Sequence, residues 1–184
     1  MAKEIEVKIY GIDVAAVQRK LESLGAKMTK DVLQRNVAYR NDHTKRNQMS
    51  VRVRYERDIG SSKEKGFGSA VFTVKTARRV VRNHKVQDEF ETAVDGPVME
   101  RALQELGLRV RGFAEMKRTY YSLYGVSVEI CRLPDVPAYL EIEGDEAAIA
   151  KAAQALGFSQ ADYDNTPPRQ KFNIPKSKQD LVFR

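Results

Sequence analysis

Pairs of glutamates two residues apart occur three times in this sequence, at Glu4/Glu6, Glu89/Glu91 and Glu141/Glu143. Each pair lies in a stretch that alternates polar and apolar residues, so both of its carboxylates fall on one face of a β-strand. Carboxylates without a nearby cluster of His or Cys offer hard oxygen ligands, which suit Mg²⁺ or Mn²⁺ rather than zinc. If the three strands converge, the sequence predicts a site for one of these metals.

Basic residues occupy the matching face of the first strand and of other strand-like stretches: Lys8, Arg52, Arg54, Lys75 and Arg118. Glu129 has the same phase on a further strand. Arginine binds phosphate oxygens in bidentate geometry, and lysine contributes a compact positive charge. Cations beside a carboxylate-held metal are typical of metal-assisted phosphoryl transfer.

The elements that must position these residues are short strands and three amphipathic helices. The alternating stretches predict strands at about residues 4–10, 27–39, 49–56, 70–76, 86–94, 108–121, 124–133 and 139–144. Helical spacing of apolar residues predicts helices at about residues 13–24, 96–106 and 145–156, each followed by glycine. Residues 41–48 and 58–69 are expected to be loops.

The charged strand face must turn either to bulk water or toward itself. An open sheet with helices on its apolar side gives the first arrangement, and a closed barrel with a polar interior gives the second. Acidic and basic residues are nearly equal in number along these faces, so that they could neutralise one another inside a barrel. We therefore expect an α+β protein whose closed antiparallel barrel has a charged interior and about three helices outside.

The composition is that of one globular domain, expected at residues 1–163, with a basic, proline-containing tail at residues 164–184. The chain has 184 residues, of which 42% are hydrophobic and 31% charged, and its net charge of +7 indicates an anionic partner. No apolar run approaches the ~20 residues of a membrane span. A single cysteine, Cys131, allows no intrachain disulfide, and we expect a cytoplasmic protein that binds no membrane.

Other common chemistries find little support. His43 and His84 fall in predicted loops and are expected to be surface residues, while Cys131 is expected to be a small packed residue. No Walker A motif is present, because Gly66-Phe67-Gly68 precedes a strand and lacks the following Gly-Lys-Ser/Thr.

The ordered set of strand motifs resembles the CYTH superfamily, the triphosphate tunnel metalloenzymes. Six short matches follow one another between residue 4 and about residue 157: Glu4-Ile5-Glu6-Val7-Lys8, Arg52-Val53-Arg54, Thr73-Val74-Lys75, Glu89-Phe90-Glu91, Arg118-Thr119-Tyr120-Tyr121 and Tyr139-Leu140-Glu141-Ile142-Glu143. The sequence departs from the family pattern at Asn36, Gln87, Met116 and Cys131, where charged residues are usual.

The resemblance implies an eight-stranded antiparallel tunnel that grips a triphosphate. By position, the implied metal ligands are Glu4, Glu6, Glu141 and Glu143, with Glu91, while Glu89 and Glu129 are further candidates. The implied phosphate contacts are Lys8, Arg52, Arg54, Lys75 and Arg118. Glu4, Glu6 and Lys8 are the implied catalytic group, in which Lys8 orients or activates the nucleophile.

Three functions remain open from the sequence. The leading one is a phosphohydrolase that uses Mg²⁺ or Mn²⁺ and acts on inorganic triphosphate, a nucleoside triphosphate or thiamine triphosphate. The second is a class IV adenylyl cyclase, which would use the same tunnel to make cyclic AMP from ATP. The third, less favoured, is a non-catalytic polyanion or RNA-binding module, suggested by the basic run at residues 78–85 and the basic tail. Whether the chain forms a homodimer is also open.

Overall fold

The computed structural model describes residues 2–59, 69–76, 78–175 and 177–184. The strands are β1 (Ala2–Ile9), β2 (Lys27–Arg40), β3 (Ser50–Asp58), β4 (Ser69–Lys75), β5 (Arg79–Val81), β6 (His84–Val94), β7 (Arg109–Leu123), β8 (Val126–Arg132) and β9 (Tyr139–Glu143). The α-helices are α1 (Val14–Ser23), α2 (Asp42–Arg46), α3 (Gly96–Glu105), α4 (Glu146–Ala155) and α5 (Pro168–Lys171), and a 3₁₀ turn spans Gln160–Asp162.

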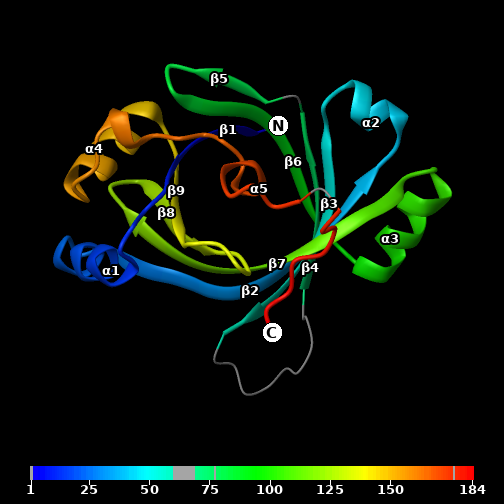
Figure 1. Ribbon diagram of the computed structural model, residues 1–184, viewed down its shortest axis with the longest axis horizontal. Helices are drawn as coiled ribbons and strands as arrows, with labels where there is room; N and C mark the ends of the chain where they lie inside the picture. The colour runs from blue at the N-terminus through cyan, green and yellow to red at the C-terminus, as the bar shows by residue number, and fades with distance from the viewer. Residues whose placement is uncertain (1, 60–68, 77, 176) are drawn as a thin grey trace.

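Eight strands close into an antiparallel barrel, as the sequence predicts. The order around the barrel is β1-β9-β8-β7-β2-β3-β4-β6, and β6 returns to pair with β1. Figure 1 looks into the resulting ring. β5 is an additional strand that pairs with the first part of β6, in a region that the sequence interpretation described only as basic.

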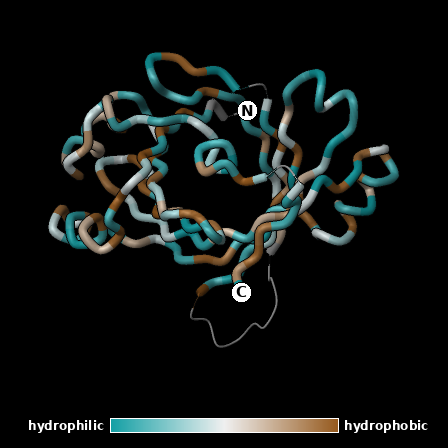
Figure 2. Tube along the Cα trace, viewed as in Figure 1, coloured by the Kyte–Doolittle hydropathy of each residue, from teal (hydrophilic) through white to brown (hydrophobic). Residues whose placement is uncertain are grey.

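Strand alternation places apolar side chains outside the barrel, where the helices pack against them. Figure 2 shows hydrophobic and hydrophilic residues alternating along the chain trace. Val7 and Ile9 of β1 belong to a core cluster with Leu21 of α1 and Ile149 of α4. The helix α1 begins at the predicted Asp13, whose carboxylate accepts a hydrogen bond from the Ala16 amide at 3.0 Å. These two helices therefore anchor β1, the strand that carries the first glutamate pair.

A second core cluster lies under α3. It joins Leu103 of that helix to Val51 and Val53 of β3 and to Ala70 of β4. Arg52 and Arg54 alternate with these valines, so burial of the valines outside turns both arginines toward the barrel interior. No helix among the described residues is long and apolar enough to cross a membrane.

The tail packs against the barrel, where Pro167, Pro168, Arg169 and Leu181 line its cavity, and it contains the short helix α5. Figure 1 shows α5 in the middle of the ring. Further on, Leu181 forms a bridge with Ala114 of β7 and is 1% exposed, in a cluster with Leu133 and Tyr139. Gly112, with φ of +140°, permits this approach, because a Cβ there would lie 2.6 Å from the Gln179 carbonyl oxygen.

Three further expectations need correction or comment. Residues 41–48 contain the short helix α2, which forms because the Asn41 side chain accepts from the Thr44 amide and the Thr44 hydroxyl accepts from the Asn41 amide. His84 is buried at the start of β6, where its ring donates to the Arg82 carbonyl and contacts Tyr163, whereas His43 is exposed as expected. Most of the predicted loop at 58–69, including Gly66-Phe67-Gly68, lies outside the described residues.

Candidate metal and phosphate site

The barrel encloses a cavity of about 640 Å³ whose walls carry both signs of charge. Among the described residues, eight basic side chains line it: Lys8, Arg52, Arg54, Lys75, Arg78, Lys85, Arg118 and Arg169. Seven glutamates of the same described ranges line it as well: Glu4, Glu6, Glu89, Glu91, Glu129, Glu141 and Glu143. Every candidate site residue from the sequence therefore faces one cavity, and the near balance of charge expected for a barrel interior is present.

Three of the glutamates form a compact cluster. Glu4 and Glu6 project from β1, and Glu143 projects from β9 opposite Glu6 in the strand register. One carboxylate oxygen from each lies within 4.8 Å of the others. Burial, and then the negative charges of Glu129, Glu4 and Glu6, raise the pKa of Glu143 to about 7. Glu4 and Glu6 form ion pairs with lysines, whereas Glu143 makes no ion pair with any described residue.

The chemistry of this cluster fits a divalent cation. Its donors are three carboxylates, which are the ligands that Mg²⁺ and Mn²⁺ prefer, and no described His or Cys lies within the cluster. A bound dication would supply the positive charge that Glu143 lacks. Glu4, Glu6 and Glu143 are thus the residues that could hold a metal together.

Lysines from two neighbouring strands pair with the same cluster. Lys75 Nζ lies 2.8 Å from Glu4 Oε1, and Lys85 Nζ lies 2.9 Å from Glu6 Oε1. Burial alone would raise the pKa of Glu4, but a hydrogen bond with Glu6 and the charges of Lys85 and Lys75 lower it to about 2. Glu4 is therefore ionised at neutral pH and available as a ligand.

A second acidic group is already neutralised by basic side chains. Glu129 and Glu141 lie close together with the Cys131 thiol, but Arg118 forms ion pairs with both, at 2.7 Å from Glu129 and 3.0 Å from Glu141. Lys8 lies 2.9 Å from Glu141 and also contacts Glu6. The sequence grouped Glu141 and Glu143 as one pair, but in the structure they belong to different clusters. The reason is that they lie opposite different residues of β1: Glu141 opposite Lys8, and Glu143 opposite Glu6.

Glu91 also lies away from the carboxylate cluster. It accepts from the Thr73 hydroxyl at 2.8 Å and lies 3.1 Å from Arg54 Nη2. Glu89 lies 3.2 Å from Lys75 Nζ, which also binds Glu4. Arg52 makes only long contacts, 3.8 Å to Glu89 and 3.7 Å to Glu91. This wall offers guanidinium groups to an anion, and Arg52 is weakly neutralised.

Several lining residues escaped the sequence interpretation. Lys85, Gln87, Glu89 and Glu91 alternate along β6, so starting that strand at 84 instead of 86 would have placed Lys85 on the charged face. Arg78 and Arg169 reach the cavity from segments without strand periodicity, and no local pattern marks them.

Two departures from the family pattern have a structural counterpart in the tail. Met116 and Cys131 belong to an apolar cluster with Leu133 and Tyr139, and Leu181 from the tail joins the same cluster. Cys131 is fully buried there, as expected for a packed residue. Both side chains also face charged groups, since Arg118 donates to the Met116 sulfur and the Cys131 thiol lies beside Glu129 and Glu141. The two replacements thus place sulfur atoms between the charged cavity and the docked tail.

The raised pKa of Glu143 predicts a pH effect on stability in the metal-free protein. An unfolded glutamate titrates near 4.5, so between pH 4.5 and about 7 the folded state holds a proton that the unfolded state has lost. We therefore expect the free energy of unfolding to decrease as the pH rises from 4.5 to about 7. The contribution of Glu143 to this decrease should be on the order of 2 kcal/mol. Glu143→Gln should remove that contribution.

Urea unfolding of the metal-free protein across this pH range would measure the effect. The exposed Glu22 on α1 supplies the matched control, since Glu22→Gln should leave the pH dependence of wild type unchanged. An unaltered slope in Glu143→Gln would show that Glu143 is not the titrating group.

Comparison with known proteins agrees with this geometry. The CYTH domain model matches residues 2–163. The PH1012 protein of Pyrococcus horikoshii is 26% identical, with a TM-score of 0.72 over 90% of this chain and 96% of that one. A Hippeastrum protein, HpAC1, described as an adenylyl cyclase candidate with a dominant triphosphatase activity, is 16% identical, with a TM-score of 0.66 over 96% of both chains.

More distant structures share the fold at lower similarity. The Mimivirus capping enzyme triphosphatase is 11% identical, with a TM-score of 0.53 over 84% of this chain and 88% of that one. The comparison with curated proteins finds no significant match. The family model covers most of the sequence and the whole barrel, and on this ground the chain belongs to the CYTH family.

Proposed function

We propose that this protein is a divalent-metal-dependent phosphohydrolase that binds a triphosphate inside the barrel. The observation that carries the proposal is the carboxylate cluster of Glu4, Glu6 and Glu143, in which Glu143 has no ion-pair partner among the described residues, beside a wall of arginines and lysines. Converging carboxylates suit a divalent metal, and arginines and lysines suit phosphate oxygens. One cavity therefore offers ligands for a metal and cations for a triphosphate.

The chain's own residues would divide the work as follows. Glu4, Glu6 and Glu143 would hold Mg²⁺ or Mn²⁺, and the chemistry supplied there is neutralisation of phosphate charge and activation of water. The phosphate oxygens would be bound by Arg52, Arg54, Lys75 and Arg118, with Lys85 as a further cation. Because these cations are positioned before substrate arrives, they need little reorganisation as charge develops in the transition state.

Lys8 would act by position and charge. Burial alone would lower its pKa, but Glu141 and Glu6 raise the pKa of Lys8 above its ordinary value. A lysine in this state remains protonated at neutral pH. It can therefore orient a phosphate oxygen or a nucleophile, but it cannot accept a proton from the attacking water.

Class IV adenylyl cyclase activity is the alternative within the same tunnel. Structural neighbours described as adenylyl cyclase candidates include proteins from Vibrio parahaemolyticus, Bacillus halodurans and Hippeastrum. Hydrolysis and cyclisation would differ in whether water or a ribose oxygen attacks. Non-catalytic RNA binding is less favoured, since Arg78 and Lys85 of the basic run and Arg169 of the tail line the cavity.

A substrate panel would test the proposal. Purified protein is incubated with tripolyphosphate, ATP or thiamine triphosphate, with Mg²⁺, Mn²⁺ or no metal, and both phosphate and cyclic AMP are measured. We expect metal-dependent phosphate release and little cyclic AMP. Cyclic AMP as the main product from ATP would favour the cyclase, and no product from any triphosphate would refute both enzymatic functions.

A further inference from the structure

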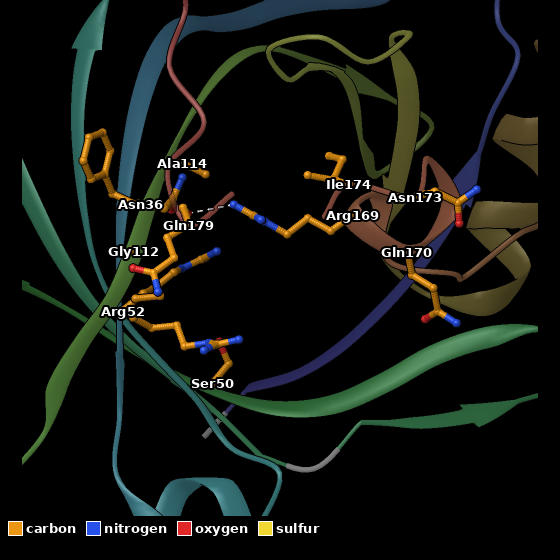
Figure 3. Close-up of a pocket in the computed structure, with 13 residues that line it drawn as sticks. Asn36, Ser50, Arg52, Gly112, Ala114, Arg169, Gln170, Asn173, Ile174 and Gln179 are labelled. Atoms are coloured by element: carbon orange, nitrogen blue, oxygen red, sulfur yellow. Dashed lines mark hydrogen bonds between the residues drawn. The ribbon is translucent and has the colours of Figure 1, made fainter. Parts of the chain in front are cut away.

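A second cavity, of about 860 Å³, opens beside the barrel cavity between the tail and strands β2, β3 and β7. Asn36, Ser50, Arg52, Ala114 and Arg169 line both cavities, so the two adjoin. Figure 3 shows Arg169 reaching from α5 toward Gln179, with Arg52 and Ser50 on the opposite wall. Arg52 and Arg169 therefore face both spaces.

The charge of this second cavity has one sign only. Arg52, Arg111 and Arg169 line it, and no acidic residue of the described chain does. Its remaining polar walls are amides and a hydroxyl, from Asn36, Ser50, Gln170, Asn173 and Gln179. The barrel cavity, by contrast, balances its cations with glutamates.

Buried polar atoms on these walls lack partners. Neither Asn36 Oδ1 nor Arg52 Nε has a hydrogen-bond partner among the described residues. Arg169 donates to the Lys178 and Gln179 carbonyls, at 2.7 and 2.9 Å, which fixes its guanidinium within the cavity. Burial and the nearby charge of Arg111 lower the pKa of Arg169, so an anion between these two arginines would relieve their repulsion.

We propose that Arg111 and Arg169, reached past Arg52, form a second phosphate subsite that lets the protein bind linear polyphosphates longer than three phosphates. The proposal rests on the proposed function, because the first three phosphates would occupy the barrel cavity. A linear polyphosphate carries negative charge along its whole length. Its additional phosphates would thus meet the arginines of the second cavity.

A nucleoside suits the second cavity less well. It is neutral and would bring no negative charge to Arg111 and Arg169 in a partly enclosed space, whereas every phosphate would. Phe113 is the one aromatic residue on the described walls, and Arg35 already lies over its ring at 5.1 Å from the centroid. Bases are commonly held by stacking on aromatic rings. The charge and the walls both favour phosphate.

Binding measurements on metal-free protein test the subsite independently of catalysis. Titration calorimetry would compare tripolyphosphate, pentapolyphosphate and ATP on wild type and Arg111→Gln. Arg111 is exposed on β7 and lies outside the catalytic group, so this variant should fold normally. A lost charge-assisted contact should weaken pentapolyphosphate about three- to tenfold and change tripolyphosphate less than twofold.

Arg109→Gln is the matched control, because Arg109 is an exposed arginine of the same strand that does not line either cavity. It should leave all three affinities unchanged. Equal weakening of tripolyphosphate and pentapolyphosphate in Arg111→Gln, or no weakening of either, would overturn the subsite, as would a loss confined to ATP. Absent phosphate release in the substrate panel would instead refute the proposed function and leave this binding comparison valid.

Discussion

Replacing Glu4 by Gln should lower metal-dependent phosphate release at least about 100-fold, since loss of a group that holds or supports a catalytic metal commonly costs that much or more. Glu4 combines a place in the three-carboxylate cluster with a pKa of about 2, so it is ionised at neutral pH. Gln keeps the size of the side chain and removes the charge. Steady-state phosphate release over a range of Mg²⁺ and Mn²⁺ concentrations would measure the loss.

Glu91→Gln provides an informative comparison for this prediction. The family pattern groups Glu91 with the metal ligands, whereas the structure pairs it with Thr73 and Arg54. We expect Glu91→Gln to keep the metal dependence of wild type and to lose less than about tenfold in rate. The reverse ranking, a mild effect at Glu4 and a severe one at Glu91, would show that the metal lies on the other wall. Circular dichroism of both variants would check that the barrel remains folded.

Lys8→Met should destabilise the protein by about 3–5 kcal/mol, the usual consequence of removing one partner from a buried ion pair. Lys8 is 6% exposed and lies between Glu6 and Glu141, which are both buried. Arg118 and Lys85 would remain beside these carboxylates, but the charge midway between them would be lost. Urea unfolding of the metal-free protein at pH 7 would measure the change.

Two further variants separate the ion pair from general effects of the substitution. Lys20 is exposed on α1, and Lys20→Met should change the free energy of unfolding by less than about 0.5 kcal/mol. Adding Glu141→Gln to Lys8→Met removes one of the uncompensated charges and should recover part of the loss. If Lys8→Met is as stable as wild type, the buried cation is not needed to balance the carboxylates.

Much of this architecture follows from local sequence. Alternation along residues 4–10 or 49–56 decides which side chains share a face, because a strand has a side-chain period of two. The amphipathic helices and their glycine stops need only helical periodicity and capping. The strands have apolar residues on one face and nearly balanced charges on the other. A barrel with a charged interior lets the helices bury the apolar face and lets the charges neutralise one another. The family motifs then added the number of strands.

The tertiary structure decided which charges meet. The sequence pairs Glu141 with Glu143, but the register between β1 and β9 sends Glu143 to Glu4 and Glu6, while Arg118 and Lys8 neutralise Glu141. The docking of the tail could not be predicted either. The local sequence around Leu181 gives no sign that this residue packs against Cys131, Leu133 and Tyr139. Local periodicity thus determined the strand faces by itself. The metal cluster and the arginine-lined cavity arise from contacts between residues far apart in the chain, whose partners no local pattern specifies.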